Sequence, residues 1–475
     1  MTVADATADF EQGRHDRNDL LGHPKGLWFL GFTEACERFS YYSMQTLLVL
    51  YMVNYLLKPG RMEHVIGLQW LQQNIYHGIS GQPLASAIFG TYTALVYGTP
   101  IVGGIIADKW LGRNKTLILG GVLMAIGHFL MAIEPAFIFA LLALLLGVGA
   151  FKGNIATQVG SLYGPTDLRR AMAFQIFYIF INVSVIVAPL ISGTLGQSER
   201  FGWHYGFGCA GVVMVLGLFI YLAGRRYLAP EDRLSQVFGD EQPANAPTVR
   251  EPMTRDDWVC LTYLIILIPV LAVSLLTNQE IFNGYLTWGD QHFDLTLLNN
   301  TSSWLITVDA AVSFIMLVAV AAFWKLWSFK YREPDEITKM IIGSVFTVAG
   351  GLCLFMAALT QPPGGKISLF WPMMFEICNS IGFAHVLPIS LALFSKIAPK
   401  QITSTVIGLY YFSFFIANAV VGYVGGLYSS LPTTTFWLIH VASAAFGLIA
   451  FVLFKLALGS RMAGTGAREQ AKALG

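Results

Sequence analysis

Residues 34–42 read EACERFSYY and lie inside a hydrophobic run over 27–57. That run is long enough to cross a bilayer, because a hydrocarbon core of about 30 Å needs about 20 helical residues. Glu34, Glu37 and Arg38 would then sit near the middle of a membrane-spanning helix, where a charged side chain costs about 2.5–3.5 kcal/mol on insertion scales. Such charges are expected to face the interior of a helix bundle or a water-filled cavity.

The composition is that of an integral membrane protein. Of the 475 residues, 55% are hydrophobic and 12% are charged, and the mean hydropathy is +0.59, whereas soluble chains carry about 25% charged residues. The net charge of +1 gives no indication of nucleic-acid binding. The five cysteines form no CxxC motif, so neither a metal site nor a disulfide framework is expected. No nucleophile–base set indicates an enzyme, and no cofactor is expected.

Twelve hydrophobic runs predict twelve transmembrane helices, because backbone polar groups in lipid must be paired within the helix. They lie near residues 27–57, 84–107, 116–133, 136–158, 171–194, 203–224, 257–284, 303–327, 337–360, 368–395, 404–428 and 434–458. The polar N-terminal residues lack the apolar segment of a cleaved signal peptide, so the first span is expected to direct insertion.

Lysine and arginine residues predict the orientation. If the N-terminus is cytoplasmic, 23 of the 29 fall in cytoplasmic tails and loops and four in outer loops. This bias predicts that both termini are cytoplasmic, with tails over 1–26 and 460–475. The two remaining cations, Arg38 and Lys152, lie inside predicted spans.

The largest polar interruption, residues 225–256, is rich in charge and proline and lies between the sixth and seventh spans. It is interpreted as a cytoplasmic linker between two six-helix bundles, over 27–224 and 257–459. This predicts an all-α membrane protein with the layout of the major facilitator superfamily fold, in which two bundles rock around a site near the midplane.

The charges of the first span share one helix face, because Glu34, Glu37, Arg38 and Tyr41 are spaced i, i+3, i+4 and i+7. Glu34 precedes Arg38 by four residues, which is the favourable order for an intrahelical ion pair. A charged face on a transport path is the favoured interpretation, and a structural pair that locks the helix is the alternative.

Two more ionisable residues lie inside spans. Lys152 is part of the glycine-rich GVGAFKGNI, and Glu376 is part of FWPMMFEICNSIGF in the tenth span. A cavity between the halves would therefore be positive on the N-terminal side, with Arg38 and Lys152, and negative on the C-terminal side, with Glu376. Such a cavity suits a zwitterion; snorkelling of Lys152 to the inner surface and a structural role for Glu376 are the alternatives.

Three histidines within spans, His128, His385 and His440, are expected to be packed and hydrogen-bonded imidazoles rather than functional groups.

EACERFSYY resembles the ExxERFxYY motif of the proton-dependent oligopeptide transporter (POT) family at every fixed position. GGIIADKWLGRNKT (103–116) resembles the loop that follows the family's second span, and FYIFIN (177–182) its FYxxIN motif. Lys152 and Glu376 resemble its lysine of span four and glutamate of span ten. The resemblance covers essentially the whole chain. It implies a symporter that imports di- and tripeptides with protons by alternating access.

The resemblance also implies roles for individual residues. Arg38 and Lys152 would hold the peptide carboxylate, and Glu376 and Asn182 its amino group. The tyrosines that would line the pocket are Tyr41, Tyr42, Tyr92 and Tyr410, the last at a position where the family commonly has tryptophan.

Protons would be the coupling ion. Glu37 is the first candidate to carry the coupling proton, Glu34 the second and Glu280 the third. When a peptide carboxylate pairs with Arg38, a buried glutamate loses its cation. That glutamate is then expected to bind a proton, because desolvation disfavours the carboxylate ion. The family's usual glutamate of span seven is replaced if Asn278-Gln279 aligns with its Glu-Gln pair, and Glu280 is the nearby substitute.

Asp108 and Arg113, in the DKWLGR segment at the inner end of span two, are expected to belong to a cytoplasmic gate. The expected partners are small peptides and the lipid bilayer, without nucleic acid, for a chain that works as a monomer in the plasma (bacterial inner) membrane. A carrier of another small solute and a peptide-binding sensor with little transport remain the alternative functions.

Overall fold

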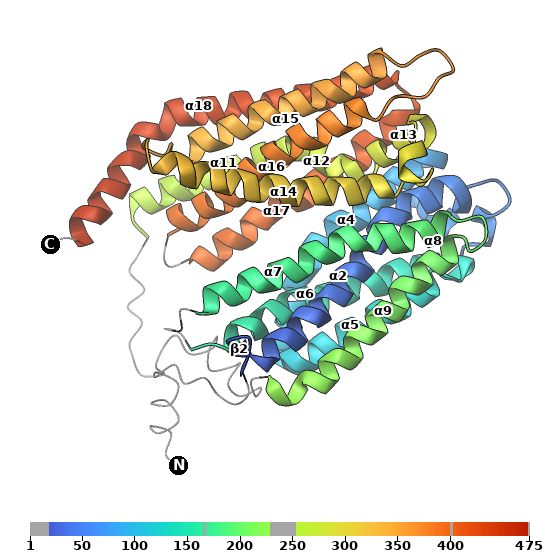
Figure 1. The fold of residues 1–475 in the computed structure, drawn as a ribbon, viewed down its shortest axis with the longest axis horizontal. Coiled ribbons are helices and arrows are strands. Elements are labelled where there is room, and N and C mark those ends of the chain that lie inside the picture. The colour runs from blue at the N-terminus through green and yellow to red at the C-terminus, as the bar shows by residue number, and fades with distance from the viewer. Residues whose placement is uncertain (1–18, 165–166, 168, 229–252, 400–401, 474–475) are drawn as a thin grey trace. The chain divides into compact units, whose positions relative to one another are not determined.

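The computed structural model describes residues 19–164, 167, 169–228, 253–399 and 402–473, and this part of the chain is almost entirely helical (Figure 1). Long helices occupy all twelve predicted spans. They are α2 (Lys25–Tyr51), α4 (Gly81–Ile106), α5 (Arg113–Leu130), α6 (Phe137–Ser161), α7 (Arg169–Ala188), α9 (Trp203–Gly224), α11 (Arg255–Ser274), α14 (Trp304–Ser328), α15 (Glu336–Leu359), α16 (Phe370–Ile397), α17 (Thr403–Gly426) and α18 (Thr433–Ala473).

Length and apolar composition allow ten helices of the described residues to cross a membrane. The other two long helices are α2, which carries Glu34, Glu37 and Arg38, and α5, whose first turns carry Arg113 and Lys115. Exposed apolar faces are expected on membrane helices: only 17% of the apolar window of α14 is buried inside the protein. The prediction of an all-α membrane protein is confirmed.

The chain divides into two compact units, each built of packed helices. Unit 1 comprises Met1–Val249 with Thr301–Ala310, and unit 2 comprises Arg250–Asn300 with Ala311–Gly475. Most of the predicted linker, and residues 1–18 of the predicted N-terminal tail, lie outside the described residues. The predicted C-terminal tail is largely helical, because α18 continues to Ala473.

In unit 1, α2 packs against α7 and α9, and α6 packs against α4 and α5. The contact between α5 and α6 depends on two facing glycines. A Cβ on Gly120 would lie 2.7 Å from the carbonyl oxygen of Gly147, and a Cβ on Gly147 would lie 2.8 Å from that of Gly120. Small residues at such a crossing let two membrane helices approach backbone to backbone.

In unit 2, α15 packs against α16 and α18, and α17 packs against α11 and α16. Two helices begin with side-chain caps: Thr254 and Asp257 form a capping box at the start of α11, and Asp335 accepts a hydrogen bond from the backbone N–H of Thr338 at the start of α15. These caps pair N–H groups that the first helical turn leaves without a partner.

The seventh span is not one continuous helix, and the prediction of a single span over 257–284 is wrong in this respect. After α11 the chain forms α12 (Leu276–Gln279), η7 (Glu280–Phe282) and α13 (Gly284–His292). The carboxylate of Glu280 accepts a hydrogen bond from the N–H of Gly284 at 2.9 Å, so a side chain satisfies the first N–H of α13 that the break exposes.

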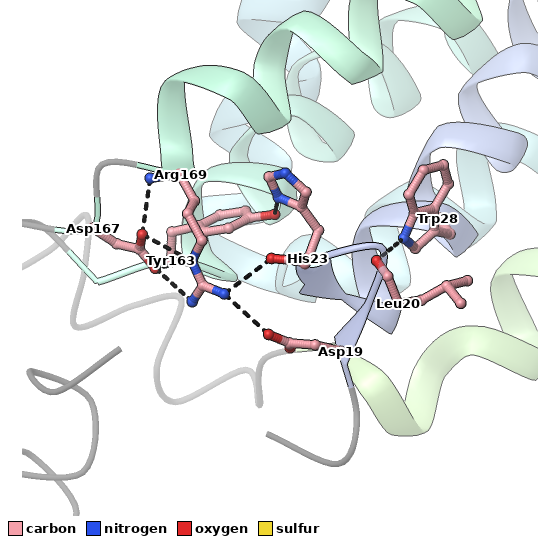
Figure 2. A network of polar contacts seen from close by, with 8 residues as sticks. Asp19, Leu20, His23, Trp28, Tyr163, Asp167 and Arg169 are labelled. Atoms are coloured by element: carbon pink, nitrogen blue, oxygen red, sulfur yellow. Dashed lines mark hydrogen bonds and ion pairs between the residues drawn. The ribbon is translucent and has the colours of Figure 1, made fainter. Parts of the chain in front are cut away.

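The residues before α2 form a two-stranded hairpin, β1 (Asp19–Leu20) and β2 (His23–Pro24). Arg169, at the start of α7, lies between Asp19 and Asp167 (Figure 2), with Nη1 3.0 Å from Asp19 Oδ2 and Nη2 2.9 Å from Asp167 Oδ2. His23 Nδ1 lies 2.8 Å from the hydroxyl of Tyr163. The hairpin is thus attached to the segment that joins α6 to α7.

Candidate functional site

The predicted charged face of α2 exists, and it is buried in unit 1. Arg38 Nε lies 3.0 Å from Glu34 Oε1 and 2.5 Å from Glu37 Oε2. Glu34 is 4% exposed, Glu37 0% and Arg38 6%. A single helix therefore holds one guanidinium between two carboxylates, as the i, i+3, i+4 spacing predicted.

The two ion pairs leave hydrogen-bonding capacity unused. Within the described residues, neither Nε nor Nη2 of Arg38 has a hydrogen-bond partner with acceptable geometry, and the same holds for both carboxylate oxygens of Glu37. A guanidinium presents its donors in a planar fork that matches a carboxylate. The site is therefore electrostatically paired, while Nη2 of Arg38 keeps a donor without a partner among the described residues.

Aromatic rings lie beside Arg38 and Lys152, the two cations predicted within the spans. The guanidinium carbon of Arg38 lies 5.4 Å from the ring centre of Tyr41, and Lys152 Nζ lies 4.9 Å from that of Tyr97. Cation–π contacts of this kind stabilise a positive charge without neutralising it. Lys152 also interacts electrostatically with Glu34 and Glu37, so both predicted cations act on the same pair of acids.

The predicted pocket tyrosines of unit 1 gather around α2. The rings of Tyr41 and Tyr42 meet edge to face with centroids 5.1 Å apart, and Tyr92 of α4 interacts electrostatically with Glu37. Tyr42 interacts with Asp309, which belongs to the first turns of α14 that cluster with unit 1. Asp309, which was not among the predicted site residues, thus interacts with a predicted pocket tyrosine.

Asn182 does not join this cluster through its amide. Its Nδ2 donates to the carbonyl oxygen of Tyr178, one turn earlier in α7, at 2.8 Å.

Unit 2 contains the remaining predicted site residues at separate positions. Glu376 of α16 is 1% exposed. Tyr410 of α17 is 2% exposed, and its hydroxyl donates to the carbonyl oxygen of Leu387 at 3.0 Å and lies 3.2 Å from Ser390 Oγ. Tyr410 therefore links α17 to α16.

Glu280 is fully buried in unit 2 and lies beside His440 of α18. Its Oε1 accepts from Asn283 Nδ2 at 3.0 Å and from the N–H of Gly284, and its Oε2 lies 3.6 Å from His440 Nε2. The neighbouring Gln279 accepts through Oε1 from Asn418 Nδ2 at 3.1 Å. The ionisable side chain beside Glu280 is thus a histidine, His440.

The other two span histidines are as expected. His128 is fully buried against Ser40. His385 Nε2 accepts from Trp324 Nε1 at 3.1 Å, and its Nδ1 lies 2.8 Å from the carbonyl oxygen of Ile381.

The predicted gate residues form a pair at the junction of α4 and α5. Asp108 lies in η3 (Ala107–Leu111), which continues α4, and Arg113 begins α5. Arg113 Nη2 lies 3.3 Å from Asp108 Oδ1, across a turn at Gly112 that has φ of 74°. Glycine adopts this conformation without steric cost.

The structure adds two residues that sequence reasoning missed, Tyr97 beside Lys152 and His440 beside Glu280. A tyrosine one turn and a half after Tyr92 gave a weak signal for the first. An isolated histidine in an apolar span gave none for the second. In the described part of the chain, no cluster of three or more His, Cys, Asp or Glu side chains is placed to hold a metal ion.

The sequence profile of the Major Facilitator Superfamily matches residues 30–422, most of the chain. The chain belongs to the Major Facilitator Superfamily. This confirms the predicted fold class, and an integral membrane protein of this superfamily is a transporter rather than an enzyme.

Two relatives and one solved structure indicate the family to which this chain belongs within the superfamily. The peptide transporter YePEPT of Yersinia enterocolitica is 27% identical, over 86% of this chain and 88% of the relative. A di-/tripeptide transporter of Lactococcus lactis is 27% identical, over 92% and 96%. A crystal structure of the peptide transporter POT bound to alafosfalin matches with a TM-score of 0.78 and 25% identity, over 96% and 98%. The resemblance to the POT family is confirmed.

Proposed function

We propose that this transporter imports di- and tripeptides together with protons by alternating access. The observation that carries the proposal is the buried Arg38, which is paired with two glutamates yet retains an Nη2 without a hydrogen-bond partner in the described residues. The peptide-transporter relatives and structures support the substrate class.

In this proposal, Arg38 and Lys152 bind the carboxylate of the peptide. A carboxylate that enters beside Arg38 competes with Glu34 and Glu37, which lie within 3.0 Å of the same Nε. The acid that loses its partner takes up a proton, because a buried and unpaired carboxylate ion is disfavoured by desolvation. Peptide binding and proton binding are linked by this competition for one guanidinium.

The amino group of the peptide is assigned to Glu376 and Asn182 through the resemblance, with Tyr41, Tyr42, Tyr92 and Tyr410 lining the pocket. An ammonium would bind Oδ1 of Asn182, because Nδ2 of the same amide donates to the carbonyl oxygen of Tyr178. Asp108 and Arg113 act in the cytoplasmic gate.

No cofactor takes part, and protons are the coupling ion. One net charge that moves inward across 100 mV provides about 2.3 kcal/mol, which supports roughly fifty-fold accumulation because about 1.4 kcal/mol is tenfold. We place the protein in the plasma (bacterial inner) membrane as a functional monomer with both termini in the cytoplasm, on the distribution of Lys and Arg.

The test uses purified protein in lipid vesicles with an imposed, inwardly directed proton gradient. We expect a labelled dipeptide to accumulate, and a protonophore to abolish the accumulation. Accumulation that is unaffected by the protonophore would contradict proton coupling. Saturable binding of the peptide without accumulation would instead indicate a sensor. Neither binding nor accumulation of dipeptides and tripeptides would indicate a carrier of another solute.

A further inference from the structure

Glu280 and His440 form an acid–imidazole pair that is completely enclosed in unit 2, since each side chain is 0% exposed. Glu280 lies in η7, at the break of the seventh span, and His440 lies on α18. The distance between Glu280 Oε2 and His440 Nε2 is 3.6 Å, which is longer than a hydrogen bond. How many protons this pair holds follows from the other contacts of both side chains.

The tautomer of His440 is fixed by its backbone neighbour. Its Nδ1 lies 3.0 Å from the carbonyl oxygen of Phe436. A carbonyl oxygen only accepts, so Nδ1 must carry a hydrogen and donate. In a neutral imidazole the second nitrogen then carries no hydrogen. Nε2, the atom that faces Glu280, is therefore an acceptor unless a further proton is bound there.

The carboxylate of Glu280 is likewise an acceptor on the side that faces His440. Its Oε1 is occupied by two donors, Asn283 Nδ2 at 3.0 Å and the N–H of Gly284 at 2.9 Å. Neither Glu280 Oε2 nor His440 Nε2 has a hydrogen-bond partner among the described residues. Without an additional proton, two buried acceptors face each other, and both stay without a hydrogen bond, which is unfavourable in a buried site.

The surroundings are shaped to hold the carboxylate in this place. A Cβ on either Gly284 or Gly425 would come within 2.6 Å of Glu280 Oε1. The ring of Phe436 lies 4.7 Å and that of Trp437 5.0 Å from the ring of His440, so the histidine is enclosed by aromatic side chains. Glycine at both positions therefore leaves the space that the carboxylate occupies.

The neighbours of Glu280 include residues of two further helices, α17 and α18. Helix α17 contributes Gly425 and, through Asn283, the carbonyl of Val421. Helix α18 contributes His440, an ionisable side chain whose charge acts on Glu280. The charged residues at the start of α15 are engaged elsewhere, Glu336 with Lys396 at 2.7 Å and Lys339 with Glu333.

We propose that Glu280 and His440 share one proton and form an enclosed proton-binding site within unit 2. The proton lies between Oε2 and Nε2, and a closure of roughly half an ångström brings the two atoms into hydrogen-bond distance. The pair is either a protonated carboxyl that donates to a neutral imidazole or an imidazolium that donates to a carboxylate. This statement concerns the chemistry of the pair and does not depend on the transported solute.

His385 provides an internal control. Its Nδ1 also lies near the carbonyl oxygen one turn earlier, that of Ile381, but its Nε2 accepts from the indole N–H of Trp324. The same tautomer is therefore satisfied at His385 without an added proton. A method that distinguishes the two histidines tests the proposal within a single sample.

The test is spectroscopic, on the full-length protein in lipid near neutral pH, with histidine labelled by nitrogen-15. The His440 resonances are assigned by their loss in His440→Gln, and the carbonyl band of a protonated Glu280 by its loss in the infrared difference spectrum of Glu280→Gln. We expect either an imidazolium at His440 or a protonated carboxyl at Glu280, with His385 neutral.

A neutral His440 together with an ionised Glu280 in the wild-type protein would overturn the proposal. Glu280→Gln keeps an acceptor for Asn283 and Gly284 and presents an amide N–H to His440, so His440 is expected to be neutral in this variant. If Glu280→Gln does not fold, His440→Gln alone decides, because the carboxyl band is expected to shift when its imidazole partner is removed. An unchanged carboxyl spectrum in His440→Gln, with His440 neutral in the wild type, would also overturn the proposal.

Discussion

Arg38 Nε lies 2.5 Å from Oε2 of Glu37, the residue directly before it in α2, and both residues are buried. Adjacent residues on a helix do not normally face each other, so both long side chains must turn toward the same side. Glu34 approaches the same Nε from the preceding turn. The proposed coupling depends on this arrangement, in which two carboxylates pair with the same guanidinium.

Arg38→Ala is expected to abolish peptide uptake, because it removes the donor for the peptide carboxylate. It also leaves two buried acids without their cation, and removal of one partner from a buried pair costs about 3–5 kcal/mol. Uptake must therefore be compared with thermal unfolding of the same preparation. Arg38→Lys keeps the charge but not the planar fork, and we expect it to insert and fold with greatly reduced uptake.

Arg61→Ala is the matched control for Arg38→Ala. Arg61 is the cation of an exposed pair in the same unit, with Nη1 2.8 Å from Glu134 Oε1 and a side chain that is 42% exposed. This variant is expected to keep wild-type uptake. Wild-type uptake by Arg38→Ala would remove Arg38 from the binding site.

The attachment of the N-terminal hairpin is expected to weaken as the pH falls. Hydrogen bonds from Arg169 lower the pKa of Asp167 below its ordinary value. Burial, with a further contribution from the charge of Arg169, lowers the pKa of His23. The hydrogen bonds between Arg169 and Asp167 lie within one segment, so the pH dependence of the attachment is assigned to His23. His23 binds a proton more tightly when the hairpin is detached, so acid favours detachment. Its contribution is complete above about pH 6.5 and is lost below it.

Hydrogen exchange at the backbone amides of 19–24, corrected for the intrinsic pH dependence, measures this attachment. We expect lower protection at pH 5 than at pH 7.5 in the wild type. His23→Gln cannot titrate, so the loss of protection between these two values is expected to be smaller in the variant. Protection that is constant over this range in the wild type, or that falls equally in both proteins, would contradict the prediction.

The charged face of α2 could be predicted from the sequence because it depends on local helix geometry. The break of the seventh span could not, because it depends on packing between distant segments. The grouping of Glu34 and Arg38 follows from helix periodicity alone, because residues four apart lie on the same face. At the break of the seventh span, the carboxylate of Glu280 accepts from the N–H of Gly284 and lies near His440 of the last helix. Neither partner leaves a periodic signal in the sequence, so one uninterrupted span was the natural prediction.

Asp108→Asn is expected to change the turnover rate more than the affinity for peptide. The Asp108 side chain is 61% exposed and 3.3 Å from Arg113 Nη2, and exposed pairs contribute only about 0–1 kcal/mol to stability. The variant is therefore expected to unfold at nearly the wild-type temperature. Uptake rates and equilibrium binding of the same dipeptide separate the two effects. Reduced affinity with a normal turnover rate would place Asp108 in the binding site instead of the gate.

Arg113→Gln is the companion variant, because it removes the other member of the same pair. If the pair acts as a unit in the gate, the turnover rates of Asp108→Asn, Arg113→Gln and the double variant are expected to be similar. Effects that simply add in the double variant would indicate that the two residues act independently.

Glu37→Gln is expected to lose proton-driven accumulation while it retains peptide exchange. Glu37 is fully buried and 2.5 Å from Arg38 Nε. Two carboxylates that compete for one cation titrate as a coupled set, and a peptide carboxylate that enters the site joins that competition. Glutamine can hydrogen-bond at this position but cannot bind or release a proton. The variant therefore resembles the protonated state permanently, which permits binding and exchange but not coupling.

Counterflow and gradient-driven uptake by Glu37→Gln are measured side by side in the same vesicles, with Glu34→Gln in parallel. Glu34→Gln is the matched control because Glu34 shares the same Nε at the longer distance of 3.0 Å, and it is expected to retain more of the driven uptake. If Glu37→Gln accumulates peptide at the wild-type rate, Glu37 does not carry the coupling proton. The enclosed pair of Glu280 and His440 is then the next site to test, because Glu280→Gln would remove driven uptake and leave counterflow intact.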